Sequence, residues 1–488
     1  MASYDYDLGV IGAGAAGLTL TSGAAQMGAK TLLVEAREKL GGDCLHFGCV
    51  PSKTLIKTAQ VYQQMKSGPK FGLPEVTPPP VDFSQISARI QSVIDSIQDH
   101  DSVERFCSLG AEVKFGRAEF VDEHSISLEG KKITAQKWAI ATGSRPALPP
   151  IKGLQSINYL TNENIFYMQS LPGEMIVLGG GPIAIEMAQA INRLGCQVTV
   201  VQRSAQILSK EDKDMADLVQ NVLQSEGVRV YTGLSTLEVR EEQGQKIVLA
   251  QDKQGREYTF KAEALLVALG RKASVDTLDL EKAGVEFHKK GIPVDNKMRT
   301  NQGHIYAIGD ITGKYQFTHA AGYEAGVALS NAIIHFPKKA DYTWMPRATY
   351  TDPELAALGK TEAQLKAEGI DYSLWTEMFQ DNDRSLTEGY ETGKLKLLLD
   401  SKEKILGIQV MGPSAGELLG EWSAVVNGSL KLSTLASAVH AYPTLAEINK
   451  RVAGDVLAPK IFEGFLKKGV NMLFNYKGRA CDLGSDED

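Results

Sequence analysis

Short apolar runs alternate with helical stretches of small residues in the first half of the chain. Residues 6–11 are a mainly apolar run, and a glycine-rich turn, a stretch rich in Ala and Leu, and a second apolar run at 31–34 follow it. The same order returns with apolar runs at 175–178 and 197–201. A strand, a tight turn, a helix and a second strand in this order predict two βαβ units, each with a parallel sheet.

The C-terminal part of the chain has a different pattern. From about residue 346, strand-like segments at 394–399 and 405–411 are followed by helical stretches, which predicts an α+β domain. The fold class is therefore expected to be α/β, with two Rossmann-like dinucleotide-binding domains and a C-terminal α+β domain. Turns rich in Pro and Gly lead us to place the domain boundaries near residues 150, 275 and 345. The expected domains are 1–150, 151–275, 276–345 and 346–488.

Composition and charge exclude several classes of protein. The chain has 488 residues, with 52 Lys and Arg against 59 Asp and Glu, and 43% of its residues are hydrophobic. These values are ordinary for a globular chain of several domains and exclude collagen-like, coiled-coil and disordered proteins. The mildly acidic balance gives no reason to expect a nucleic-acid partner. No secretion signal and no bilayer-spanning apolar run is visible in the sequence, so a cytoplasmic location is expected.

The turn after the first predicted strand carries a dinucleotide fingerprint. Gly12, Gly14 and Gly17 follow this strand, and Glu35 ends the next one. The first two glycines permit a tight turn and the close approach of a pyrophosphate, and the third allows helix and strand to pack. Glu35 is placed to accept hydrogen bonds from a ribose. The strands, the helix and the acid together favour a nucleotide site over a plain turn.

The second fingerprint has Gly179, Gly181 and Ala184 in its turn but no acid at the end of the following strand. Gln202 stands there, and Arg203 comes next. A carboxylate would repel a 2′-phosphate, whereas an arginine can bind it through two hydrogen bonds. This favours NADPH, with NADH as the second choice. An arginine that simply faces solvent is the alternative.

Two nucleotide folds in one chain are typical of a flavin enzyme, in which one dinucleotide stays bound and a nicotinamide binds reversibly. Further strand-to-glycine turns lie at Ala141-Thr142-Gly143, at Gly270 and at Gly309-Asp310. Asp310 could hydrogen-bond a second part of the first nucleotide. Taken alone, these turns are ordinary.

The segment from Gly41 to Lys53 contains two of the five cysteines, Cys44 and Cys49. A zinc site needs further ligands, and no second Cys or His cluster is near in the sequence. In a regular helix, residues five apart have Cα atoms about 8.7 Å apart, whereas a disulfide needs about 4.4–6.8 Å. A bond between the two cysteines therefore requires an irregular turn, which the nearby glycines permit. In a chain with two nucleotide folds, a redox-active disulfide is favoured over a structural one.

With these motifs in place, the sequence resembles the flavin-dependent pyridine nucleotide–disulfide oxidoreductases, the family of dihydrolipoamide dehydrogenase, glutathione reductase and mercuric reductase. The resemblance extends over nearly the whole chain and includes both fingerprints, the cysteine segment, and the stretch Tyr350-Thr351-Asp352-Pro353-Glu354. It implies FAD in domain 1–150, NAD(P)H in 151–275, a central domain 276–345 that completes the FAD site, and a homodimer formed through 346–488.

The resemblance also implies roles for individual residues. Cys49 would face the flavin as the charge-transfer thiolate, and Cys44 would be the interchange thiol. Lys53 and Glu186 would form an ion pair near the flavin. The positions implied for FAD are Gly12, Gly14, Gly17, Glu35, Gly42, Lys53, Ala141, Thr142, Gly143, Gly309 and Asp310. The positions implied for NADP are Gly179, Gly181, Ala184, Arg203 and Gly270. No metal site is expected.

One departure from the family pattern bears on the substrate. Disulfide-reducing members carry a His as acid–base for the interchange thiol, and Tyr442 stands at that position, followed by Glu447, which could orient the phenol. A phenol titrates near ~10 and an imidazole near ~6.5, so Tyr442 cannot replace His at neutral pH. Mercuric reductases also carry Tyr here, and two thiolates with a phenol suit a soft metal. Those enzymes end in a vicinal Cys pair, whereas this chain has only Cys481 near its end.

We therefore expect electrons to pass from NAD(P)H through flavin and the Cys44–Cys49 pair to a small thiol, a disulfide or a soft metal. The alternative within the same class is a dihydrolipoamide dehydrogenase-like enzyme that uses His440 as the base. An alternative of another class is a redox sensor or a membrane-associated partner-binding module. Residues 459–476 form a basic amphipathic segment, which suits a membrane surface or a dimer partner. The dimer partner is favoured, and a membrane partner is not expected.

Overall fold

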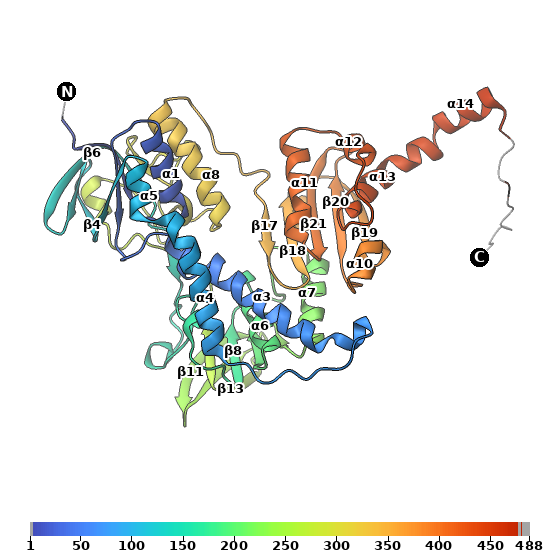
Figure 1. The fold of residues 1–488 in the computed structure, drawn as a ribbon, viewed down its shortest axis with the longest axis horizontal. Coiled ribbons are helices and arrows are strands. Elements are labelled where there is room, and N and C mark those ends of the chain that lie inside the picture. Colours follow the sequence, from blue (N-terminus) through green and yellow to red (C-terminus); the bar gives the residue numbers. More distant parts are fainter. Residues whose placement is uncertain (1–2, 477–479, 481–488) are drawn as a thin grey trace. The chain divides into compact units, whose positions relative to one another are not determined.

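The computed structural model describes residues 3–476 and residue 480. The chain forms two compact units, Met1–Asp352 and Pro353–Asp488 (Figure 1). The first unit contains both predicted nucleotide folds, and the second contains most of the predicted α+β domain.

A seven-stranded sheet with the order β3-β2-β1-β6-β5-β4, in which β16 also pairs with β6, lies at the centre of the first nucleotide fold. Strands β3, β2, β1, β6 and β16 pair in parallel, whereas β4, β5 and β6 form an antiparallel meander. The strands are β1 (Tyr6–Ile11), β2 (Thr31–Glu35), β3 (Ala111–Phe115), β4 (Ala118–Asp122), β5 (Ser125–Leu128), β6 (Lys131–Ile140) and β16 (Ile305–Ala307). Helices α1 (Ala15–Gln26) and α8 (Thr318–Leu329) pack against each other and share a buried cluster with Val10 of β1.

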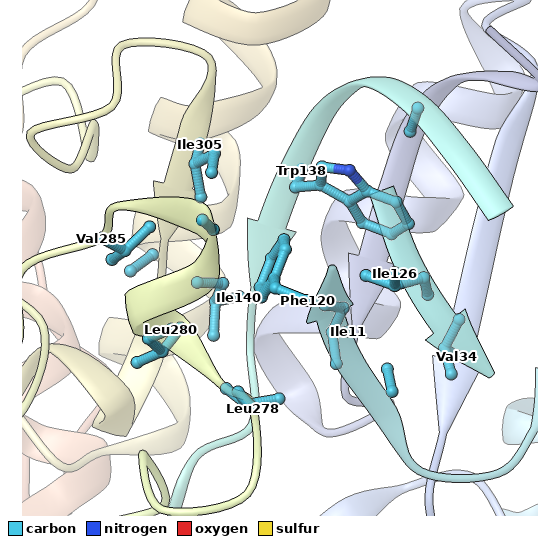
Figure 2. Close-up of a cluster of buried hydrophobic side chains, with 14 of the residues drawn as sticks. Ile11, Val34, Phe120, Ile126, Trp138, Ile140, Leu278, Leu280, Val285 and Ile305 are labelled. Carbon is cyan, nitrogen blue, oxygen red and sulfur yellow. The ribbon is translucent and has the colours of Figure 1, made fainter. Parts of the chain in front are cut away.

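The opposite face of this sheet buries a second apolar cluster, shown in Figure 2. Successive strand residues point to opposite faces, so Ile11 of β1 belongs to this cluster although its neighbour Val10 does not. Trp138 of β6 is fully buried and meets Phe120 edge to face, with ring centroids 6.0 Å apart. Burial of one such side chain stabilises the fold by about 1.5–3 kcal/mol. Ile305 of β16 also lies in the cluster, which therefore fixes the strands whose carboxyl ends carry the predicted nucleotide residues.

The second nucleotide fold has a four-stranded parallel sheet with the order β10-β9-β8-β14. Its elements are β8 (Glu174–Leu178), α6 (Pro182–Arg193), β9 (Gln197–Val201), α7 (Lys213–Ser225), β10 (Arg229–Tyr231) and β14 (Ala264–Val267). An antiparallel sheet of β11 (Ser235–Glu242), β12 (Gln245–Gln251) and β13 (Glu257–Ala262) lies between β10 and β14 in the sequence. The other helices and strands of the first unit are α2 (Gly42–His46), α3 (Cys49–Lys66), α4 (Phe83–Gln98), α5 (Val103–Ser108), β7 (Ser144–Pro146), β15 (Arg271–Ala273) and β17 (Arg347–Thr349).

The second unit is built on an antiparallel sheet in which β18, β21, β20 and β19 are neighbours in that order. Its strands are β18 (Glu354–Gly359), β19 (Ser373–Met378), β20 (Lys394–Leu399) and β21 (Ile405–Gly412). Its helices are α9 (Glu362–Glu368), α10 (Asp383–Thr387), α11 (Ala415–Asn427), α12 (Leu432–Ser437), α13 (Glu447–Phe462) and α14 (Phe465–Phe474). The fully buried Trp422 of α11 donates its indole N–H to Asn449 of α13 at 2.7 Å, which joins the two helices.

The expected fold class is confirmed: each nucleotide fold of the first unit is built on parallel strands, and the second unit is α+β. The domain boundaries near residues 150, 275 and 345 stay a prediction. The amphipathic segment 459–476 differs from a single helix, because α13 ends at Phe462 and α14 begins after an extended Gly464. Within the described part of the chain, no helix is both long enough and apolar enough to span a bilayer.

Candidate active site

The turns that follow the parallel strands of the first unit meet at one edge of the sheet. The Gly12 N–H donates to Val34 O, and the Ala141 N–H donates to Ile11 O, both at 2.8 Å. Gly309 follows β16, which pairs with β6 at the same edge. The structure thus brings together turns that are up to 297 residues apart in the sequence, the difference between 309 and 12.

The first glycine turn is packed too tightly for side chains at two positions. A Cβ on Gly17 would lie 1.8 Å from the Gly12 carbonyl oxygen. A Cβ on Gly42 would lie 2.6 Å from Gly14 Cα, so the cysteine segment packs directly on the nucleotide turn. Helix α1 has no side-chain cap at its start, which leaves its first N–H groups available to a phosphate.

Two carboxylates border this cradle. Glu35 accepts a hydrogen bond from the Ala13 N–H at 2.7 Å, which holds the acid beside the turn. Asp310 follows Gly309 and accepts a hydrogen bond from the Ser144 hydroxyl, and burial raises the pKa of its carboxyl above the ordinary value. Thr142 and Gly143 lie between Ala141 and Ser144 in the adjoining turn. An uncapped helix start, a backbone cradle and two acids fit a dinucleotide such as FAD.

The second glycine turn repeats this geometry with fewer constraints. A Cβ on Gly179 would lie 2.4 Å from the Ala268 carbonyl oxygen, whereas a Cβ on Gly181 would meet no atom within 4 Å. Ala184 is buried at the third position, and α6 also begins without a side-chain cap. Arg203 is exposed, and its guanidinium has no hydrogen-bond or ion-pair partner among the described residues. Gly270, in the turn after β14, has a φ of +118°.

The two site cysteines lie on two different helices. Cys44 is in α2, and Cys49 is the first residue of α3, so the helix is interrupted between them as a close pair requires. Both are free thiols here, with Cys44 half-buried and Cys49 exposed. The Cys44 thiol donates a hydrogen bond to Cys49, and this contact lowers the pKa of Cys49 to about 6. The same hydrogen bond, followed by burial, raises the pKa of Cys44. The pair therefore holds one thiolate and one thiol at neutral pH.

The predicted ion pair next to these cysteines is present. Lys53 Nζ lies 2.8 Å from Glu186 Oε2, and the Glu186 side chain is only 5% exposed. The other Glu186 oxygen accepts the Tyr350 N–H at 2.9 Å, and Lys53 lies over the Tyr350 ring at 4.3 Å. The positive charge of Lys53 also helps to lower the pKa of Cys49.

Two further residues at the thiol pair were not found by sequence reasoning. Thr318, the first residue of α8, places its hydroxyl 3.2 Å from Cys49 Sγ and hydrogen-bonds Cys44 as well. Asp43, next to Cys44, lies 3.2 Å from the Arg271 guanidinium, and its negative charge contributes to the raised pKa of Cys44. Thr318 gave no signal because it is 269 residues away from Cys49 in the sequence. Asp43 lies within the Gly41–Lys53 segment but gave no signal, because a carboxylate has no redox chemistry of its own.

The predicted acid–base candidates all belong to the second unit. Tyr442 is 71% exposed and donates its phenol to Asp383 Oδ2 at 2.8 Å, which raises the pKa of the phenol. Glu447, the expected partner of this phenol, instead accepts the Thr444 N–H at 3.3 Å. Sequence reasoning missed Asp383 because it is 59 residues from Tyr442 and lies outside every motif identified in the sequence.

His440 is not equivalent to Tyr442, although it is only two residues away. Its Nε2 lies 2.9 Å from Glu421 Oε1, and its side chain is 9% exposed. The imidazole is thus held against α11, while the phenol of Tyr442 is open to solvent. Cys481 lies outside the described residues.

Comparisons with known proteins agree with this geometry. Residues 6–325 match the family described as pyridine nucleotide-disulphide oxidoreductase, and residues 345–453 match its dimerisation domain. The mercuric reductase of Staphylococcus aureus is 32% identical over 445 residues, which cover 91% of this chain and 81% of that protein. A dihydrolipoyl dehydrogenase of Bacillus subtilis (strain 168) is 35% identical over 447 residues, which cover 90% of this chain and 96% of that protein.

A solved structure supports the same assignment. The Cu(II) complex of the HOCl-induced flavoprotein disulfide reductase RclA from Escherichia coli has a TM-score of 0.83 at 25% identity, and the match covers 93% of this chain and all of that one (100%). The second unit carries the dimerisation domain, which supports a homodimer. Members of the matching family depend on FAD and take electrons from NAD(P)H. The chain is thus an oxidoreductase that belongs to the pyridine nucleotide-disulphide oxidoreductase family.

Proposed function

We propose that the protein takes electrons from NADPH and delivers them through the Cys44–Cys49 pair to a soft metal ion, in the manner of a mercuric reductase. When bound, FAD supplies the two-electron transfer between the nicotinamide and the disulfide. Two electrons and two protons convert the disulfide into two thiols, one of which ionises. A divalent soft metal ion bound by the two sulfurs is then reduced by two electrons to the metal, and the disulfide forms again.

The observation on which this proposal rests is that the pKa values of the two thiols are shifted in opposite directions. Cys49 is held as a thiolate by the Cys44 hydrogen bond, by Thr318 and by Lys53. Cys44 keeps its proton at neutral pH because its pKa is raised. A soft ion displaces that proton when it binds sulfur, because thiolate ligands suit soft metals. No separate base on the protein is then needed.

The environment of Tyr442 supports a metal rather than a disulfide as the acceptor. Reduction of a disulfide substrate releases thiolates that need protons from a group titrating near neutral pH. The Tyr442 phenol has a raised pKa and donates to Asp383, so it keeps its proton under those conditions. A phenol is nevertheless suited to contact a soft cation beside two sulfurs.

The choice of NADPH rests on Arg203. Its guanidinium is exposed and has no partner among the residues that the structure describes, and Arg203 is next to the position after β9 where NAD-specific sites place an acid. Gln202, at the acid position, carries no charge that would repel a 2′-phosphate.

The test is steady-state NADPH oxidation by the flavin-loaded dimer with Hg(II), lipoamide, glutathione disulfide, a quinone and oxygen in turn. We expect Hg(II)-dependent turnover that Cys44→Ser and Cys49→Ser both abolish. The value of kcat/KM for lipoamide should be about a hundredfold below that of an enzyme with an imidazole base. Tyr442→His should raise lipoamide turnover. Fast lipoamide turnover by the unmodified protein, or Hg(II) turnover that survives Cys44→Ser, would contradict the proposal.

A dihydrolipoamide dehydrogenase-like activity is the second candidate, and the contact of His440 with Glu421 favours it. A histidine whose Nε2 bonds a carboxylate can act as an acid–base pair. In that case His440→Asn should abolish lipoamide turnover and leave Hg(II) turnover intact. Loss of both activities would indicate a structural role for His440.

A further inference from the structure

Helix α14 follows the dimerisation domain and has no buried residue. The match to the family's dimerisation domain ends at residue 453, so α14 lies beyond the segment that the family shares. Gly464 separates it from α13 with an extended backbone, and Figure 1 shows α14 continuing outward from α13, away from the sheet of the second unit. A surface helix of this kind needs a partner for its apolar side chains.

The apolar face of α14 is broad and strongly exposed. Phe465 is 91% exposed, Met472 83% and Leu473 76%. At about 100° per residue, these side chains together with Leu466, Val470 and Phe474 cover an arc of about 200° of the helix surface. Phe462, Phe465 and Phe474 also supply the aromatic rings that suit a membrane–water interface.

The remaining arc of α14 is basic. Lys467 and Lys468 lie at its two borders, next to the apolar face, and Asn471 lies between them on the helix surface. No Asp or Glu occurs between residues 464 and 476. Neither lysine forms an ion pair among the described residues, whereas the chain as a whole carries a formal charge of −7. The positive charge is therefore concentrated beside the exposed apolar face.

This arrangement favours a lipid surface over a second copy of the chain. A protein partner that covered the apolar arc would also desolvate the two border lysines, and it would have to offer acids to them. In an anionic bilayer, the apolar arc enters the acyl region while the lysine stems extend outward to the phosphates. We propose that α14 binds the surface of anionic membranes and holds the enzyme there peripherally.

The test is flotation of the flavin-loaded full-length protein with vesicles of phosphatidylcholine alone or of phosphatidylcholine with phosphatidylglycerol. We expect the protein to float with the anionic vesicles, to stay in solution with phosphatidylcholine alone, and to be released by high salt. Leu473→Glu should abolish flotation. The double substitution Lys467→Glu and Lys468→Glu should weaken binding by at least roughly twenty-five-fold, the product of about fivefold for each lysine. Replacement of both lysines by Arg should preserve it.

A matched control is available in the first unit, where Lys289 and Lys290 are also adjacent and exposed. Their double replacement by Glu makes the same change in net charge and should leave flotation unaffected. All variants should keep NADPH oxidation and bound flavin, because α14 lies outside the folded core. Equal flotation with both kinds of vesicle, or equal effects of the two lysine pairs, would overturn the proposal. So would a fall from dimer to monomer mass in Leu473→Glu without lipid, since α14 would then be part of the dimer interface.

Discussion

At the scale of single residues, the chemistry depends on two thiols with opposite acidities. Cys44 donates and Cys49 accepts, so the same hydrogen bond lowers one pKa and raises the other. Lys53 and Thr318 stabilise the charge on Cys49, while the carboxylate of Asp43 disfavours a charge on Cys44. The Gly41–Lys53 segment contains both sulfurs, Asp43 and Lys53, whereas Thr318 and Glu186, which also act on the pKa of Cys49, come from elsewhere in the chain.

Removal of the donor should therefore raise the pKa of Cys49. In Cys44→Ala, we expect the pKa to move from about 6 up toward the ordinary thiol value, since the largest stabilising contact is gone. The rate of iodoacetamide alkylation of reduced protein, followed against pH, measures it. Thr318→Val should also raise the pKa of Cys49, but by less than Cys44→Ala does, because the Thr318 hydrogen bond is the smaller contribution. Cys196→Ala, which removes a buried thiol away from the pair, is the control. An unchanged profile in Cys44→Ala would show that the two sulfurs do not interact.

Arg203 should decide between the two nicotinamides. Arg203→Glu replaces an exposed guanidinium with a carboxylate that repels the 2′-phosphate. KM for NADPH should rise by about tenfold to a hundredfold, while KM for NADH, which lacks this phosphate, changes little. The two KM values measured on the same preparation control each other. Equal rises for both would place Arg203 outside the 2′-phosphate site.

At the scale of elements, the two glycine turns differ in the space that they leave for a side chain at the third position of the fingerprint. Gly17 has no space for a Cβ, whereas the matching position of the second turn already holds Ala184. Gly17→Ala should push α1 away from β1 and release FAD, and the ratio of flavin absorbance to protein after gel filtration measures this loss. Ala184→Gly is the matched variant, and it should keep its flavin at a cost of about 1 kcal/mol of helix stability. Full flavin retention by Gly17→Ala would mean that the turn can relax.

The elements predicted best from the sequence were those whose local pattern and tertiary role agree. The first fingerprint and its strands match β1, α1 and β2, because the glycines, the apolar runs and Glu35 that predict these elements are close together in the sequence. The Lys53–Glu186 contact was available only through the family resemblance. Asp383 was missed because its contact with Tyr442 comes from the packing of distant segments, which no local pattern records.

At the scale of the whole molecule, the residues named in the proposed function are divided between the two units. The thiol pair belongs to Met1–Asp352, and Tyr442 belongs to Pro353–Asp488, which carries the dimerisation domain. The exposed phenol of Tyr442 and the 96% exposed side chain of Val439 lie on the surface of the second unit. The family resemblance implies that this surface completes the site of the other subunit in a homodimer.

Subunit complementation tests this arrangement. Cys44→Ser and Tyr442→Ala should each be inactive with Hg(II) as homodimers. If one subunit supplies the thiols and the other the phenol, a hybrid of the two variants has one site with both defects and one intact site. Random exchange makes about half of the dimers hybrid, so a mixture should recover about a quarter of the wild-type activity. A mixture of either variant with itself is the control. If each chain formed its own site, every hybrid site would carry one defect, and the mixture would remain as inactive as its components.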